Sequence, residues 1–193
     1  MNELFSTINE YVNIFVENLG LWGPFLGCLF IIIESIIPIL PLSIFITLNF
    51  LAFGNIFGFI ISYLCTVIGC MISFVIFRDG VQTLFERRLR NKSAVDKIMN
   101  VIDKLKFEHL VLLITVPFLP AFAINIAAGL SKMNLKKYLS ALFIGKAFFV
   151  YFWGFVGTGI LESLTNPGSL VKVVLIIVVA YILSRFMSKK VKN

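Results

Sequence analysis

Residues 35–77 read SIIPILPLSIFITLNFLAFGNIFGFIISYLCTVIGCMISFVIF and contain no charged side chain. One straight helix over this range would measure about 65 Å, roughly twice the ~30 Å hydrocarbon core of a bilayer. The run must therefore fold back on itself. Its helix breakers are Pro38-Ile39-Leu40-Pro41 and Gly54-Asn55.

The composition of the whole chain agrees with a membrane environment. Of 193 residues, 59% are hydrophobic and 14% are charged, against about 45–50% and about 25% in soluble domains. This excludes a soluble protein and predicts an all-α membrane protein. The net charge of +7 comes from basic residues beside apolar runs, where they anchor the chain at the inner membrane face. Membrane lipids are therefore the expected partners, and nucleic acid is not.

The N-terminal half is predicted to contain a hairpin followed by a span. Residues 1–18 alternate apolar and polar side chains at helical spacing, so we expect an amphipathic helix lying in the interface. Residues 19–53 are interpreted as a re-entrant hairpin with its tip near Pro38–Pro41. Residues 56–77 then form a true span.

Residues 78–108 form the one hydrophilic stretch of the chain, and the positive-inside rule places it in the cytoplasm. Four of its arginines are expected to face anionic lipid head groups, namely Arg78, Arg87, Arg88 and Arg90.

The C-terminal half repeats the pattern. Residues 109–131 are broken at Pro117–Pro120 and have basic residues on both sides, so both ends should be cytoplasmic and the segment re-entrant. Residues 138–161 then cross outward, and residues 169–187 return as a C-terminal span. The alternative is that the prolines merely kink ordinary spans.

The two halves match in order but have opposite predicted orientation. Each has an apolar arm, a Pro-x-Leu-Pro break, a second arm with an Asn (Asn49 or Asn125), a Gly (Gly54 or Gly129) and a span. Two inverted repeats with broken helices are typical of secondary transporters. Within residues 19–161 we therefore predict two inverted repeats, each a re-entrant hairpin plus a span.

The order of these motifs resembles the DedA family, whose shared region is also called the SNARE-associated or VTT domain. The matching residues are Glu34-x-x-x-Pro38-x-x-Pro41, Gly54, Phe77-Arg78-x-Gly80, Pro117-x-x-Pro120-x-x-x-x-Asn125-x-x-x-Gly129-Leu130-Ser131, Gly145 and Gly157. The resemblance covers roughly residues 20–160. It implies a multi-pass cell-membrane protein that moves a phospholipid or a polyprenyl-phosphate carrier between leaflets.

The chain departs from the family pattern at two places. The position two residues after Pro41, often a second acid, is Ser43, and no arginine occurs in 107–131. These departures favour a divergent subgroup.

Two charged residues fall within the apolar segments. Glu34 lies about 18 Å beyond Trp22 along a helix, and Lys146 about 13 Å beyond Lys137. Charges at such depth indicate function. The alternatives are that Glu34 is a protonated helix cap and that Lys146 snorkels to the surface. Lys146 could also pair with Glu34 or meet an anionic head group.

Further candidates for a substrate or ion pathway surround the helix breaks, where polar groups could equally bond freed backbone. They are Pro38, Pro41, Ser43, Asn49, Pro117, Pro120, Asn125 and Gly129.

Three functions remain open from the sequence. The first is a lipid flippase or scramblase, the second an ion- or proton-coupled antiporter of small solutes, and the third a membrane assembly or interaction factor. The sequence contains no nucleophile–base set, no phosphate-binding loop and no metal-ligand spacing, so we expect neither an enzyme nor a cofactor. A homo-oligomer is compatible with the sequence.

Overall fold

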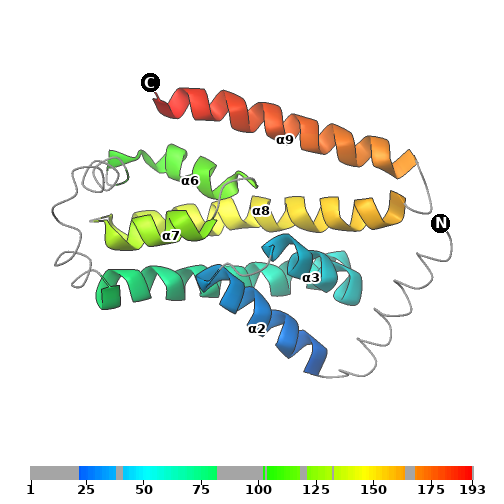
Figure 1. Ribbon diagram of the computed structural model, residues 1–193, viewed down its shortest axis with the longest axis horizontal. Helices are drawn as coiled ribbons and strands as arrows, with labels where there is room; N and C mark the ends of the chain where they lie inside the picture. The colour runs from blue at the N-terminus through cyan, green and yellow to red at the C-terminus, as the bar shows by residue number, and fades with distance from the viewer. Residues whose placement is uncertain are drawn as a thin grey trace.

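The computed structural model describes residues 22–37, 41–81, 102, 104–117, 121–131, 133–163 and 168–192. Throughout these ranges the regular secondary structure is helical (Figure 1), which confirms the all-α prediction. The predicted interfacial helix 1–18 lies outside the described residues. So do Pro38, Pro120, Arg87, Arg88 and Arg90.

The first break in the chain separates α2 (Trp22–Ile36) from α3 (Leu42–Val75). A residue before proline is disfavoured in the α-conformation, so α2 cannot continue through Ile37 into Pro38. Pro41 precedes α3 with extended backbone angles, φ −65° and ψ 116°. The helix therefore restarts immediately after the Pro-x-Leu-Pro sequence.

A second break divides α3 at Gly54, whose backbone has φ 74° and ψ 177°. Side chains with a Cβ avoid this region, and glycine does not. The two parts of α3 fold back on each other, because a Cβ on Gly58 would lie 2.6 Å from the Asn49 carbonyl oxygen. The first part, 42–53, is about 18 Å long, which is too short to cross a bilayer. We call α2 and this first part of α3 the first broken pair.

The second part of α3 extends beyond the predicted end at residue 77, as the π-helix η1 (Ile76–Val81). Arg78 in η1 donates a hydrogen bond from Nη1 to the Met133 carbonyl, 3.1 Å away. This contact ties the end of the helix to the loop before α8, which explains why helical structure outlasts the apolar run.

The second broken pair consists of α6 (Phe107–Thr115) and α7 (Ala121–Leu130). Val116, which precedes Pro117, has extended angles of φ −64° and ψ 117°, as expected for a residue before proline. Two long helices follow, α8 (Leu135–Ser163) and α9 (Gly168–Lys192). Both extend past the predicted spans, because helical hydrogen bonding does not need to stop at a membrane boundary.

The helices form one bundle in which α8 contacts α3, α6 and α9, while α2 contacts α3 and α7. Figure 1 shows α6 running in from one end of the bundle and α7 running back to it, whereas α2 starts near the other end.

The two broken pairs meet about halfway along the second part of α3. A Cβ on Gly69 would lie 2.6 Å from Ser35 Cβ, near the end of α2. From the other pair, Asn125 accepts a hydrogen bond from Tyr138, whose hydroxyl is 3.4 Å from the Cys70 carbonyl. Gly69 and Cys70, which are neighbours on α3, thus lie close to residues that belong to the two pairs or contact them.

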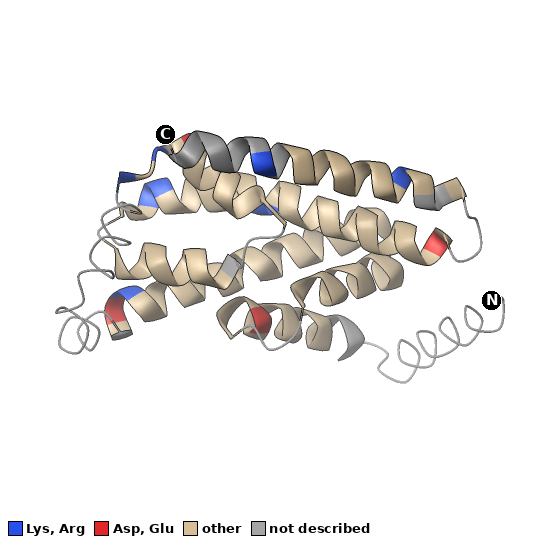
Figure 2. Cartoon of the chain, turned by 45° about the horizontal axis from the view of Figure 1, so that its top comes forward, with Lys and Arg blue, Asp and Glu red and all other residues tan. Residues whose placement is uncertain are grey.

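Two of the described helices are long and apolar enough to cross a membrane, Leu42–Gly80 and Leu135–Ser163. α9 contributes a shorter apolar segment, Val171–Ile182. Most charged side chains lie toward the two ends of the bundle, and a few lie between them, including an acidic one on α2 (Figure 2). One end is held together by the contacts of Arg78 with Met133 and of Lys137 with Leu105. We call it the basic end, because it holds Arg78, Lys104, Lys106, Lys136 and Lys137 against Asp79 and Glu108.

Candidate functional site

Lys146 lies in the buried face of α8, and only 1% of its surface is exposed. The buried positions of α8 recur at helical spacing, so the lysine occupies a place where the pattern calls for an apolar residue. The first part of this stripe consists of Tyr138, Ala141, Leu142, Gly145, Lys146, Phe149 and Val150. The side chain is enclosed by protein, which excludes the interpretation that it snorkels to the surface.

The surroundings of Lys146 are apolar. Its Nζ lies 4.5 Å from the centre of the Phe149 ring and has no hydrogen-bond partner among the described residues. Phe149 packs with Ile46 and Phe50 of α3 in one buried cluster. An ammonium over an aromatic face is attracted by the ring, but this contact alone does not replace the hydration that burial removes.

Glu34 is the acidic counterpart in the first broken pair. It lies near the end of α2 and is 8% exposed. It does not pair with Lys146, whose Nζ has no hydrogen-bond partner in the described part of the chain. Both charges are buried in the bundle, as their depth in the sequence predicted. Their roles as pathway residues stay predictions.

Asn49 belongs to a satisfied polar cluster. It is 3% exposed, and its Nδ2 donates to Ser62 Oγ at 3.1 Å. Thr66 donates to the Ser62 carbonyl at 2.6 Å. The Asn49–Ser62 bond joins the two parts of α3 across the Gly54 turn, whereas the Thr66 bond lies within the second part. Ser43, half-buried, participates through its carbonyl, which accepts from Thr47 Oγ1 at 2.8 Å.

Asn125 on α7 is only partly satisfied. It is 1% exposed; its Oδ1 accepts a hydrogen bond of 2.8 Å from Tyr138 Oη, and its Nδ2 has no partner in the described ranges. Tyr138 is fully buried and stacks on Phe74 with 4.3 Å between ring centres. Ser73 Oγ is another buried hydroxyl without a partner among the described atoms.

Sequence reasoning missed Tyr138 and three residues of the second part of α3, Ser62, Thr66 and Ser73. Tyr138 precedes Lys146 by eight residues, which places both on one face of a helix. That spacing was a usable signal. Ser62, Thr66 and Ser73 share the buried face of α3 in the same way.

The remaining predicted residues lie at the helix breaks or at contacts between helices. Pro41 precedes α3, and Pro117 follows α6. Gly129 is buried where α7 crosses the end of α3, and a Cβ there would lie 2.7 Å from the Phe74 carbonyl oxygen. Arg78 is half-buried, with its guanidinium 5.5 Å from the centre of the Phe74 ring. It is therefore held by protein contacts at the basic end.

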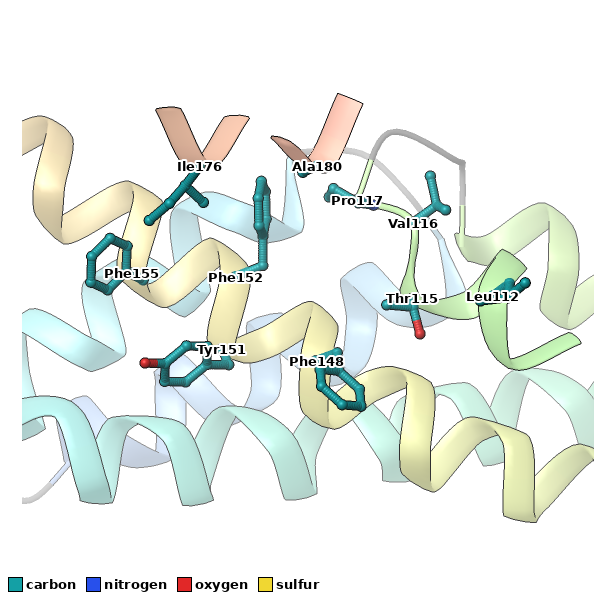
Figure 3. Close-up of a pocket in the computed structure, with 10 residues that line it drawn as sticks. All are labelled: Leu112, Thr115, Val116, Pro117, Phe148, Tyr151, Phe152, Phe155, Ile176 and Ala180. Carbon is teal, nitrogen blue, oxygen red and sulfur yellow. The ribbon is translucent and has the colours of Figure 1, made fainter. Parts of the chain in front are cut away.

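A cavity of about 350 Å³ lies between α6, α8 and α9. Its α8 side consists of aromatic rings, of which Phe152 points toward Ala180 of α9 and Phe155 lies near Ile176 (Figure 3). These four residues, Phe148, Tyr151, Phe152 and Phe155, lie by helical periodicity on the side of α8 away from Lys146. The cavity suits hydrocarbon and does not include the buried lysine.

The described residues contain no group of three or more His, Cys, Asp or Glu side chains that could hold a metal ion. The buried polar side chains of the described residues carry one ammonium (Lys146), one carboxyl group (Glu34), two amides (Asn49 and Asn125) and several hydroxyls. Such a set can bind and pass polar groups.

Comparisons with known proteins agree with the ordered motifs. The VTT domain matches residues 37–159, which include the second part of α3, the α6–α7 pair and most of α8. An uncharacterized membrane protein of Bacillus subtilis (strain 168), YhjE, is 30% identical over 184 residues, which cover 95% of this chain and 87% of that protein. No solved structure matches the chain. The chain is thus a membrane protein that belongs to the VTT domain family, the DedA family.

Proposed function

We propose that this protein moves a lipid with a phosphate-bearing head group between the leaflets of the cell membrane, as a flippase or scramblase. The observation that carries the proposal is the buried Lys146. It is 1% exposed and has no hydrogen-bond partner in the described residues. An unpaired ammonium within an apolar bundle costs at least about 2.5 kcal/mol at the helix centre. A phosphate-bearing head group is the anion that a membrane supplies at this position.

The broken helix pairs support this proposal because they bring polar groups to mid-bundle. In this proposal α2 with the first part of α3, and α6 with α7, each enter and leave the bilayer on one side, as two inverted hairpins. Their arms of 15, 12, 9 and 10 residues span only about 14–22 Å each. The end of α2 and the Tyr138–Asn125 pair lie near Gly69 and Cys70 of α3. Broken backbone at membrane depth needs such cover by protein or by a polar cavity.

Substrate class follows from charge and apolarity together. The ammonium selects an anionic group, and the largely apolar surface of the bundle keeps hydrocarbon chains in lipid. Phospholipids and polyprenyl phosphates share both features. The basic end lies on the cytoplasmic side in this arrangement.

The test is transport in liposomes that contain fluorescent phosphatidylglycerol, with dithionite added outside to bleach the outer leaflet. Lys146→Met should slow exchange at least tenfold. The matched control is Lys172→Met, because Lys172 is an exposed lysine on α9 and should keep the wild-type rate. Wild-type exchange by Lys146→Met at equal incorporation would refute the proposal.

Glu34 favours a second candidate, proton-coupled antiport of a small solute. A buried carboxyl group can carry a proton, and Glu34 is 8% exposed in α2. This candidate requires solute uptake that follows an imposed pH gradient in liposomes that show no lipid exchange.

A further inference from the structure

The buried polar atoms near Lys146 are distributed unevenly along α8. Tyr138 and Lys146 share the buried stripe of α8 and are about 12 Å apart by helical rise. Tyr138 lies nearer the basic end, next to Lys137, whose ammonium contacts the Leu105 carbonyl.

Toward the basic end, the groups that lack partners are hydrogen-bond donors. Asn125 is held by Tyr138 through Oδ1, so the hydrogen bond orients its amide. Its NH2 group has no partner among the described residues. An uncommitted amide NH2 in a buried site is a donor for an anion.

Phe74 connects this amide to the cationic surface. One ring contact is the stack with Tyr138, and the other is Arg78, whose guanidinium lies 5.5 Å from the ring centre. Arg78, the Tyr138–Asn125 pair and Lys146 thus follow one another from the basic end to mid-bundle.

Beyond Lys146, toward the other end, the buried face of α8 is apolar. Phe149 and Val150 pack with Ile46 and Phe50, and a Cβ at Gly154 would overlap the Phe50 ring. The next buried polar side chain on this face of α8 is Ser163, at the end of the helix. The buried indole nitrogen of Trp153 also lies on this face, packed against the same apolar cluster. No Lys or Arg follows Lys146 in α8, so a phosphate would meet no cation from α8 along this half of the bundle.

From this asymmetry we infer that an anionic phosphate group reaches Lys146 from the basic end and that the Asn125 amide, oriented by Tyr138, binds it on the way. This inference rests on the proposed function and adds a second anion-binding position and a side of approach. The shared chemistry is a phosphate, carried either by a lipid head group or by free inorganic phosphate.

The first experiment replaces the amide donor without disturbing its anchor. Asn125→Asp keeps an oxygen for Tyr138 but exchanges the NH2 donor for a second oxygen, which repels phosphate. The control is Asn55→Asp, at an exposed asparagine beside the Gly54 turn, at the end of α3 away from Arg78. We expect exchange of phosphatidylglycerol to fall at least tenfold in Asn125→Asp and less than threefold in Asn55→Asp, both with circular dichroism like that of the wild type. Equal rates in the two variants would overturn the inference.

A second measurement remains decisive if Asn125→Asp does not fold. Asn125→Cys is built with the three native cysteines replaced by alanine and is labelled with an anionic sulfonate thiol reagent in nanodiscs. Phosphatidylglycerol should slow labelling at least threefold relative to a phosphate-free glycolipid. The same slowing by inorganic phosphate in glycolipid discs would identify free phosphate as the ligand. Labelling that responds to neither overturns the inference.

Different results would refute the proposed function and the further inference. If Lys146→Met abolishes exchange while Asn125→Asp is silent, lipid transport stands and the route through Asn125 is wrong. If Lys146→Met is silent, the proposed function itself is wrong.

Discussion

The two broken helix pairs share a plan but use their buried polar groups differently. In the first pair, Ser35, Thr47 and Asn49 each have a hydrogen-bond partner within 3.1 Å. In the second pair, Asn125 uses only its oxygen, and Lys146 on the adjacent span has no hydrogen-bond partner in the described part of the chain. Satisfied polar groups hold a structure together, and unsatisfied ones remain available to a ligand. Under the proposed function, this difference favours a scaffold role for the first pair and a recognition role for the second pair with α8.

The largest expected effect would break the scaffold side of this comparison. Gly154→Leu should prevent the first pair from seating on α8, because even a Cβ there would overlap the Phe50 ring. Overpacking of this kind costs about 1–3 kcal/mol or more. Thermal unfolding in detergent should show a strong loss of stability. Gly80→Leu, at a glycine with nothing within 4 Å, should unfold like the wild type, and equal losses in both variants would contradict this packing.

The second prediction sharpens the recognition side. Lys146→Met should raise the unfolding temperature even though it removes transport. It replaces a buried ammonium, which has no hydrogen-bond partner in the described part of the chain, by an apolar side chain of similar length. The expected gain is on the order of 2 kcal/mol. Thermal unfolding in nanodiscs measures it, with Lys172→Met as the neutral control. A loss of stability in Lys146→Met would show that the lysine is a structural residue.

The third prediction compares the two asparagines directly. Asn49→Leu should destabilise the protein by about 1–3 kcal/mol, because it leaves buried Ser62 without its donor. Asn125→Leu should cost less, because the Tyr138 hydroxyl keeps a second acceptor in the Cys70 carbonyl. Chemical unfolding of both variants gives the difference. If Asn125→Leu is the more damaging change, the division into scaffold and recognition is wrong.

The smallest expected effect concerns Glu34. Glu34→Gln should keep the fold, since the side-chain shape is preserved, and should slow lipid exchange about tenfold, or about 1.4 kcal/mol, because the amide can neither carry charge nor exchange a proton. Exposed Glu162 on α8 supplies the control, Glu162→Gln. Full transport in Glu34→Gln at normal expression would identify the acid as a structural cap.

The helix breaks, the membrane environment and the burial of the two charged residues could be predicted from the sequence alone. The helix breaks at Pro38–Pro41, Gly54 and Pro117 follow from the covalent restrictions of proline and glycine, which act on neighbouring residues only. Membership of the class of membrane proteins follows from apolar runs that are too long to be exposed to water without aggregation. Burial of Glu34 and Lys146 follows from their position within those runs.

Only the tertiary structure decided which hydrogen-bond partner each buried polar side chain finds. Asn49 and Asn125 occupy matching places in the two repeats and look equivalent in sequence. Asn49 finds Ser62 across the Gly54 turn, whereas Asn125 finds Tyr138 on a different helix and its Nδ2 has no partner among the described residues. Whether a buried polar group is satisfied depends on atoms that packing brings from distant parts of the chain, and no local pattern specifies which atoms arrive. For the same reason, the failure of Lys146 to meet Glu34 became visible only when α2 and α8 were placed in one bundle.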